Sequence, residues 1–153
     1  MYIHGLNATG QGYKSNILRG IFPHLQSPDF TGTLDERMAQ LYPLLATQAD
    51  WTLVGSSFGG LMAARYACEN PLRVRRLILL APALPFPEFA AHLPPAVDVP
   101  TVILHGSRDE VVPLERTRSL AQRLFTRLDF RIVDDDHSLH HTVHQVDWRE
   151  LIG

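Results

Sequence analysis

The stretch 55–59, which reads GSSFG, contains the residues of this chain that most clearly could do chemistry. It fits the pattern G-x-S-x-G, in which a serine stands on a sharp turn between a strand and a helix. The apolar run Trp51–Val54 precedes it, and 60–68, rich in helix-forming residues, follows it. The helix N-terminus would favour negative charge beside the serine. Ser57 is therefore a candidate nucleophile, although an ordinary glycine-rich turn could have the same five letters.

A serine nucleophile needs a general base, and the base needs an acid that orients it. Asp109 lies in the loop 105–113, HGSRDEVVP, after the apolar run Val99–Leu104. His137 follows the apolar run Phe130–Val133 and three aspartates. Because the carboxyl ends of parallel strands meet at one edge of a sheet, both side chains are expected near Ser57.

Other residues could take the same roles. Asp109 could instead cap the helix predicted to begin near Leu114. Asp135 and Asp136 are alternative acids, although three aspartates in a row are typical of a solvated turn. His140 and His141 are alternative bases, predicted at the start of the last helix. His4 and His105 each precede a glycine at a strand end, and we expect them to hydrogen-bond and pack near the site.

The histidines of 137–144 and the aspartates of 134–136 also form a dense set of potential metal ligands. His140 and His144 are four residues apart, which would place both on one face of a helix. No H-E-x-x-H motif is present, and no remote residue completes the set. We expect no cofactor and no catalytic metal, and leave adventitious binding of zinc or nickel open.

Apolar runs alternate with helix-like stretches along the chain, which predicts a three-layer α/β/α sandwich around a mostly parallel sheet. The expected strands are Tyr2–Gly5, a weak one at His24–Ser27, Trp51–Val54, Leu77–Leu80, Val99–Leu104 and Phe130–Val133. The expected helices cover 13–21, 34–48, 60–68, 114–124 and 140–151. Pro43 could kink or divide the second of these.

The chain of 153 residues is expected to form one domain, 1–153, around one core. The segment 82–100 holds six prolines and is expected to be a short lid-like excursion with a helix near Glu88–His92. It is too short for a second domain.

The net charge of −2, with no basic block, gives no reason to expect nucleic acid as a partner. No apolar run approaches the roughly 18 residues of a membrane helix, and the N-terminus lacks the pattern of a signal peptide. Cys68, the single cysteine, is expected to be a buried apolar residue. These features favour a cytoplasmic protein.

The chain resembles the α/β-hydrolase superfamily, and in particular the small bacterial YqiA-type esterase branch. The resemblance rests on GSSFG, on HGLN at 4–7, on the acid loop HGSRDEVVP and on the pair Asp136-His137, in the order Ser57, Asp109, His137. Relative to the family, the chain begins at the third strand. The resemblance therefore implies about six strands in the order 4-3-5-6-7-8, almost no lid, and an open site.

The resemblance also implies roles for individual residues. Ser57 would attack an acyl carbon, His137 would act as general base and acid, and Asp109 would orient the imidazole. The backbone N–H groups of Leu6 and Phe58 would form the oxyanion hole. Further residues expected to contact the substrate are His4, Asn7 and Val111.

The activity implied is hydrolysis of a small carboxylic ester or thioester through an acyl-enzyme, without a cofactor, by a monomer or a homodimer. The alternatives are a non-catalytic binding or regulatory protein on the same scaffold, and another reaction of the fold, such as peptide cleavage or haloperoxidase-like chemistry.

Overall fold

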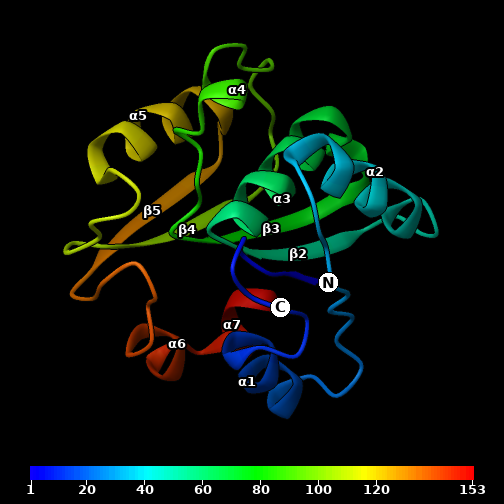
Figure 1. Ribbon diagram of the computed structural model, residues 1–153, viewed down its shortest axis with the longest axis vertical. Coiled ribbons are helices and arrows are strands. Elements are labelled where there is room, and N and C mark those ends of the chain that lie inside the picture. The colour runs from blue at the N-terminus through cyan, green and yellow to red at the C-terminus, as the bar shows by residue number, and fades with distance from the viewer.

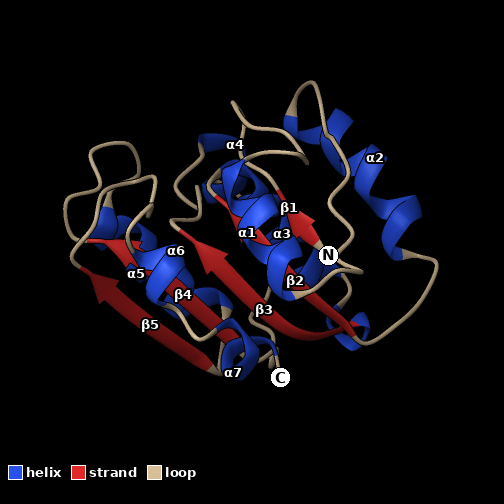
Figure 2. Ribbon diagram, turned by 90° about the horizontal axis from the view of Figure 1, so that it is seen from below, coloured by secondary structure: helices blue, strands red, loops and turns tan.

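Five parallel strands form the centre of the computed structural model, which describes residues 1–153. The strands are β1 (Tyr2–Ile3), β2 (Trp51–Ser56), β3 (Val74–Leu80), β4 (Thr101–Gly106) and β5 (Leu128–Val133). Their order across the sheet is β1-β2-β3-β4-β5, the same as their order in the chain (Figures 1 and 2). All five carboxyl ends therefore meet at one edge, where ligands bind in sheets of this kind.

Helices cover both faces of the sheet, as the alternating pattern predicted. One face carries α2 (Leu34–Leu45), α3 (Phe58–Glu69), α4 (Pro87–Ala90) and α5 (Leu114–Leu124), and the other carries α1 (Tyr13–Ile21), α6 (Thr142–Gln145) and α7 (Trp148–Ile152) (Figure 1). A cluster of 29 buried residues fills the first face and a cluster of 11 the second. The α3 face thus holds the larger core.

Local sequence explains why α2 forms. The Thr33 side chain accepts a hydrogen bond from the Glu36 N–H while the Glu36 carboxylate accepts one from the Thr33 N–H, a complete capping box. The apolar residues spaced three and four apart along the helix are buried: Leu34, Met38, Leu41 and Leu45. Pro43 lies inside the last turn without dividing the helix, which ends at Leu45 and not at 48.

The sheet has five strands and not about six, because the weak strand expected at His24–Ser27 does not form. This segment lies beside the edge strand β1 and shares one backbone hydrogen bond with it, from the Tyr2 N–H to the Gln26 carbonyl at 2.8 Å. The flanking prolines, Pro23 and Pro28, have no N–H to extend the pairing.

The last predicted helix, 140–151, is two short helices in the structure. Val146 adopts an extended backbone between α6 and α7. The Asp147 side chain then accepts hydrogen bonds from the N–H groups of Arg149 and Glu150, which starts a new helix. Periodicity alone did not reveal this break, because the cap residue is also compatible with a helix interior.

The proline-rich segment 82–100 packs against the core through the buried side chains of Leu84 and Phe89. Its one helix is α4, close to the short helix expected at Glu88–His92. A single parallel bridge, between Val97 and Phe125, ties its end to the chain after α5. Among all the helices, none combines the length and the apolar character needed to cross a membrane.

Candidate active site

Ser57 occupies the sharp turn between the last residue of β2 and the first residue of α3. Its backbone has φ 53° and ψ −115°, a conformation that non-glycine residues rarely adopt and that marks functional turns. The end of the neighbouring strand holds the turn, because the Ser57 N–H donates to the Leu80 carbonyl at 2.9 Å and the Ala83 N–H donates to the Ser57 carbonyl at 2.9 Å.

The glycines on either side of the turn allow the backbone to approach closely. A Cβ atom on Gly59 would lie 2.1 Å from the Ile3 carbonyl oxygen and 2.4 Å from that of His4. A Cβ atom on Gly55 would lie 2.5 Å from the Gly59 carbonyl oxygen. Helix α3 can therefore begin directly against the end of β1 because Gly59 lacks a side chain, and directly against β2 because Gly55 lacks one.

Three side chains from three post-strand segments meet at the carboxyl edge. The Nε2 atom of His137 lies 3.0 Å from the Oγ atom of Ser57, and its Nδ1 atom lies 2.8 Å from an Oδ2 atom of Asp109. Because the carboxylate accepts the Nδ1 proton, Nε2 is left with a lone pair for the serine hydroxyl proton. The arrangement can deprotonate Ser57 as it attacks an electrophile.

The Asp109 carboxylate is held in a fixed orientation by its own loop. Its Oδ1 atom accepts hydrogen bonds of 2.8 Å from the N–H groups of both Val111 and Val112, and its side chain is fully buried. Oδ2 is thereby directed at His137. Two N–H groups that follow the acid closely in the loop sequence fix the orientation of the carboxylate.

His105, at the end of β4, packs beneath the same carboxylate. Its side chain is fully buried and stacks on Phe130, with 6.1 Å between ring centroids. Its Nε2 atom lies 3.7 Å from Oδ2 of Asp109 and has no hydrogen-bond partner. Burial lowers the pKa of His105, more than the Gly106 carbonyl and Asp109 raise it.

The alternative acids have other partners. Asp135 accepts hydrogen bonds from the N–H and hydroxyl groups of Thr142, both at 2.8 Å. Burial would raise the pKa of Asp135, but the hydrogen bonds from Thr142 and Asp136 hold it below its usual value. Asp136 accepts a hydrogen bond from the Ser138 N–H at 2.8 Å. Both carboxylates shape the loop that carries His137.

The remaining histidines of this region make no hydrogen bond to the serine, although His140 lines the same cavity. The rings of His140 and His144 both pack edge-on against Tyr13, at centroid distances of 4.6 and 5.7 Å, and the Tyr13 hydroxyl contacts Nε2 of His144. His141 is exposed. No three His, Cys, Asp or Glu side chains are arranged to hold a metal ion.

The two backbone groups expected to bind an oxyanion lie in the same cavity as Ser57. The Leu6 N–H donates no backbone hydrogen bond, and the Phe58 N–H, as the first of α3, has no acceptor within the helix. Both donors are therefore free to bind an anion that forms beside Ser57.

Arg37 links these two residues, and our sequence analysis missed it. It is buried, donates from Nη2 to the Leu6 carbonyl at 3.3 Å, and places its Cζ atom 5.4 Å from the centre of the Phe58 ring. Its other polar contact is a 3.1 Å bond from Nε to the Gly32 carbonyl. The signal was present, because Arg37 interrupts the apolar face that Leu34 and Met38 define on α2.

His4 supports the Leu6 loop from below. Its ring is buried, with Nδ1 2.7 Å from the Gly5 carbonyl and Nε2 accepting a 2.9 Å hydrogen bond from the Phe30 N–H. Both ring nitrogens are thus engaged, and His4 is not among the residues that line the cavity.

The cavity above Ser57 has a volume of about 800 Å³. Asn7 and Val111, both expected to contact the substrate, line it, as does Phe86 from the proline-rich segment. The apolar side chains at its mouth are well exposed, Val111 by 68% and Leu6 by 53%. The cavity is therefore partly apolar and open to solvent, as a short lid implies. Cys68 lies elsewhere, buried in α3, and burial raises the pKa of its thiol to about 12.

Comparison with known proteins agrees with the fold. The sequence profile of the family described as alpha/beta hydrolase fold matches residues 31–97. No curated protein matches the chain in sequence.

Solved structures match over nearly the whole chain. A protein from Xanthomonas campestris described as a hydrolase of the alpha/beta superfamily is 26% identical, with a TM-score of 0.78 over 94% of this chain and 89% of that one. Est1E from Butyrivibrio proteoclasticus, with ferulic acid bound, is 17% identical, with a TM-score of 0.74 over 94% and 82%. The monoacylglycerol lipase of Paleococcus ferrophilus is 15% identical, with a TM-score of 0.71 over 99% and 92%.

The protein thus has the α/β-hydrolase fold, and the resemblance to that superfamily inferred from the sequence is confirmed. The assignment to the YqiA-type branch stays a prediction, as does the expectation of one domain over 1–153.

Proposed function

We propose that the protein is a serine hydrolase that cleaves a carboxylic ester or thioester of a small substrate. The observation that carries the proposal is the unbroken hydrogen-bonded chain from Asp109 through His137 to Ser57, with distances of 2.8 and 3.0 Å. The three residues supply the three requirements of acyl transfer: Ser57 the nucleophile, His137 the base and Asp109 the orienting acid.

The reaction would proceed in two halves. In the first, the Ser57 oxygen bonds to the acyl carbon as its proton passes to Nε2 of His137, and the carbonyl oxygen becomes an oxyanion facing the N–H groups of Leu6 and Phe58. The intermediate then expels the alcohol or thiol, which takes the proton from His137. In the second half, water repeats the attack with His137 as base, and releases the carboxylic acid and Ser57.

Two further features support this reaction over simple binding. A strained backbone at Ser57 costs stability and is typical of sites where the strain serves a reaction. Among proteins of similar fold, one is named a monoacylglycerol lipase and another holds ferulic acid, a carboxylic acid. An ester substrate for this chain is in keeping with both names.

The proposal is tested by labelling the folded protein with a fluorophosphonate probe, which reacts with activated serines. The parent protein should be labelled and Ser57→Ala should not. Ser107→Ala, which removes an exposed serine outside the cavity, should be labelled like the parent. Equal labelling of parent and Ser57→Ala would refute the assignment. An unlabelled parent that also turns over no p-nitrophenyl ester, acyl-CoA or peptide would favour a binding protein.

A further inference from the structure

The cavity above Ser57 has an unusual charge balance for a chain whose net charge is −2. Two cationic side chains line it, Lys14 and Arg116, and no aspartate or glutamate does. Asp109 lies beneath His137 with its carboxylate fully buried, so it does not present its charge to the cavity. The cavity therefore offers two positive charges without a counter-charge on its wall.

Neither cation is paired within the protein. Neither Lys14 nor Arg116 has a carboxylate oxygen within 4.0 Å, whereas Arg65, Arg108 and Arg131 all do. Lys14 is also partly buried, on the inner side of α1. Burial lowers its pKa, and the charges of Asp136 and Asp135 offset this only in part. A partly buried ammonium group without an ion-paired or hydrogen-bonded partner would be stabilised by an anion.

The two cations come from opposite faces of the sheet. Lys14 is on α1, and Arg116 is on α5, with the carboxyl edge between them (Figure 1). The exposed apolar side chains Leu6, Tyr13 and Val111 lie around the same cavity. The walls thus combine apolar surface with positive charge, which complements a molecule with an apolar body and a negative group.

From these observations we infer that the natural substrate is an anionic ester, whose apolar body carries a carboxylate that binds Lys14, with Arg116 adding to the attraction. The inference rests on the proposed hydrolase function and adds the class of substrate. A monoanionic carboxylate fits a pair of well-separated cations, whereas phosphate sites usually gather several arginine or backbone donors around one group.

The test compares matched esters that differ in one charge. In the first pair, the mono-4-nitrophenyl ester of glutaric acid carries a carboxylate on its acyl group, and 4-nitrophenyl valerate is its neutral counterpart. In the second pair, the valerate ester of 4-hydroxybenzoate carries the carboxylate on its leaving group, and the valerate ester of 4-hydroxybenzamide is its neutral counterpart. We expect kcat/KM to favour the charged ester by about tenfold in at least one pair, mainly through KM.

Variants then show which cationic side chain causes the preference for the charged ester. Lys14→Met should abolish most of the preference, Lys14→Arg should retain it, and the exposed Arg116→Met should reduce it by about threefold. The matched control is Arg123→Met, which removes one exposed positive charge of α5 outside the cavity and should leave the preference unchanged. A global effect of net charge would change all three methionine variants alike and would overturn the inference.

The outcomes separate the two proposals. If the fluorophosphonate labels Ser57 and the neutral esters are hydrolysed as well as the charged ones, the hydrolase proposal stands and the anionic substrate is wrong. The inference is also wrong if the charged ester is preferred equally by the parent, Lys14→Met and Arg116→Met. If Ser57 is not labelled and no ester is cleaved, both proposals are wrong.

Discussion

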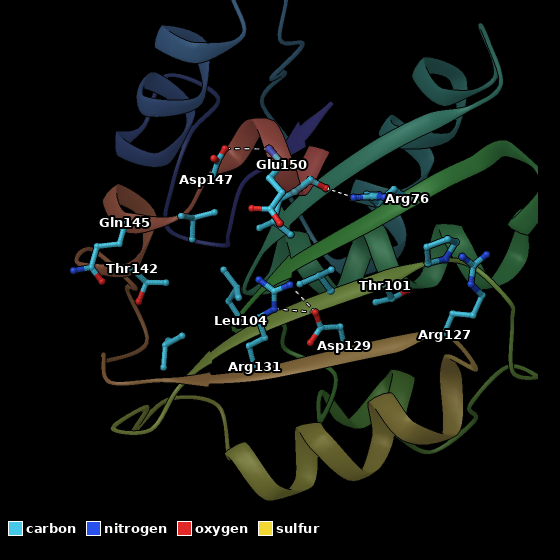
Figure 3. A pocket seen from close by; sticks show the side chains of 15 residues that line it. Arg76, Thr101, Leu104, Arg127, Asp129, Arg131, Thr142, Gln145, Asp147 and Glu150 are labelled. Atoms are coloured by element: carbon cyan, nitrogen blue, oxygen red, sulfur yellow. Dashed lines mark hydrogen bonds and ion pairs between the residues drawn. The ribbon is translucent and has the colours of Figure 1, made fainter. Parts of the chain in front are cut away.

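Two cavities against the same sheet differ in the charge of their walls. The cavity above Ser57 holds about 800 Å³, and the other, between β4, β5 and the C-terminal helices, about 570 Å³ (Figure 3). In the second cavity Arg131 pairs with Asp129 at 2.7 Å, and Arg76 donates to the Leu151 carbonyl at 2.6 Å. Acidic and basic side chains there are present in equal number, three of each.

The first cavity leaves its polar groups open. Its wall carries two unpaired cations and two free backbone donors, and it contains a serine already hydrogen-bonded to a base. Volume does not separate the two cavities, since they differ by less than a factor of two. What separates them is the charge of the wall and the reactive group: the first cavity has cations without acids and contains a serine hydrogen-bonded to a histidine, whereas the second has balanced charges and no serine.

The largest effect that we expect comes from His137. His137→Ala removes the base and should lower kcat/KM for an ester by at least about 10⁴-fold, because the members of such a triad act as a unit. His141→Ala, which removes an exposed histidine outside the cavity, should change it by less than about twofold. Rates of ester hydrolysis, from stopped or continuous assays, check both variants. If kcat/KM fell more in His141→Ala than in His137→Ala, His141 and not His137 would be the base.

A steric change tests the turn beneath the first cavity. In Gly59→Ala the new methyl group would meet the carbonyl oxygens of Ile3 and His4, and these backbone atoms cannot move cheaply. The free energy of unfolding should fall by about 3 kcal/mol or more, measured in urea. Gly20→Ala is the control, because a Cβ atom on Gly20 has no neighbour within 4 Å. It lies inside α1 and should raise stability by about 0.5–1 kcal/mol. Similar values for the two variants would contradict the packing described.

Arg37 should act by positioning the two oxyanion donors. Arg37→Met keeps much of the apolar bulk but loses the bond to the Leu6 carbonyl, and kcat should fall about 10- to 100-fold with KM little changed. A merely structural role would lower the melting temperature and leave the kcat of the folded fraction intact. Arg123→Met serves again as the control for charge. If folded Arg37→Met kept the kcat of the parent protein, Arg37 would not position the oxyanion donors.

The smallest effect should come from the second cavity. Asp129→Asn breaks the pair with Arg131, in which both side chains are 51% exposed. Exposed pairs are worth about 0–1 kcal/mol, so stability should change by less than about 1 kcal/mol and ester hydrolysis should not change. A loss of activity would show that the two cavities are coupled, against the contrast drawn above.

Much of the fold was predictable because its signals are local. The apolar runs gave β2, β3, β4 and β5, and the periodic stretches gave α1 and α5 with the same bounds as in the structure. The errors lie where a local signal is weak or competes with another. The last helix was predicted to continue through Asp147, which in fact caps a new helix. The weak strand expected at His24–Ser27 does not form between its flanking prolines.

The parts of the site that could be predicted are those that follow from the order of residues and strands along the chain. Ser57, Asp109 and His137 each follow a strand, so a parallel sheet brings them to one edge, and the structure places them within hydrogen-bonding distance. Their catalytic roles stay predictions. Features that depend on tertiary contacts were not visible in the sequence. The sequence shows that Arg37 interrupts an apolar face, but not that it bonds to the Leu6 carbonyl. Nor does it show that Lys14 lines the cavity without an ion-paired carboxylate.

The central claim is that Ser57 becomes covalently acylated, and one measurement tests it most directly. The protein is mixed with an ester in excess, quenched in acid within milliseconds to seconds, digested, and analysed by mass spectrometry. The account predicts a peptide that carries the acyl mass on Ser57, absent from Ser57→Ala. An ester that is hydrolysed by the parent protein while the acyl group is found on another residue, or on none, would contradict it.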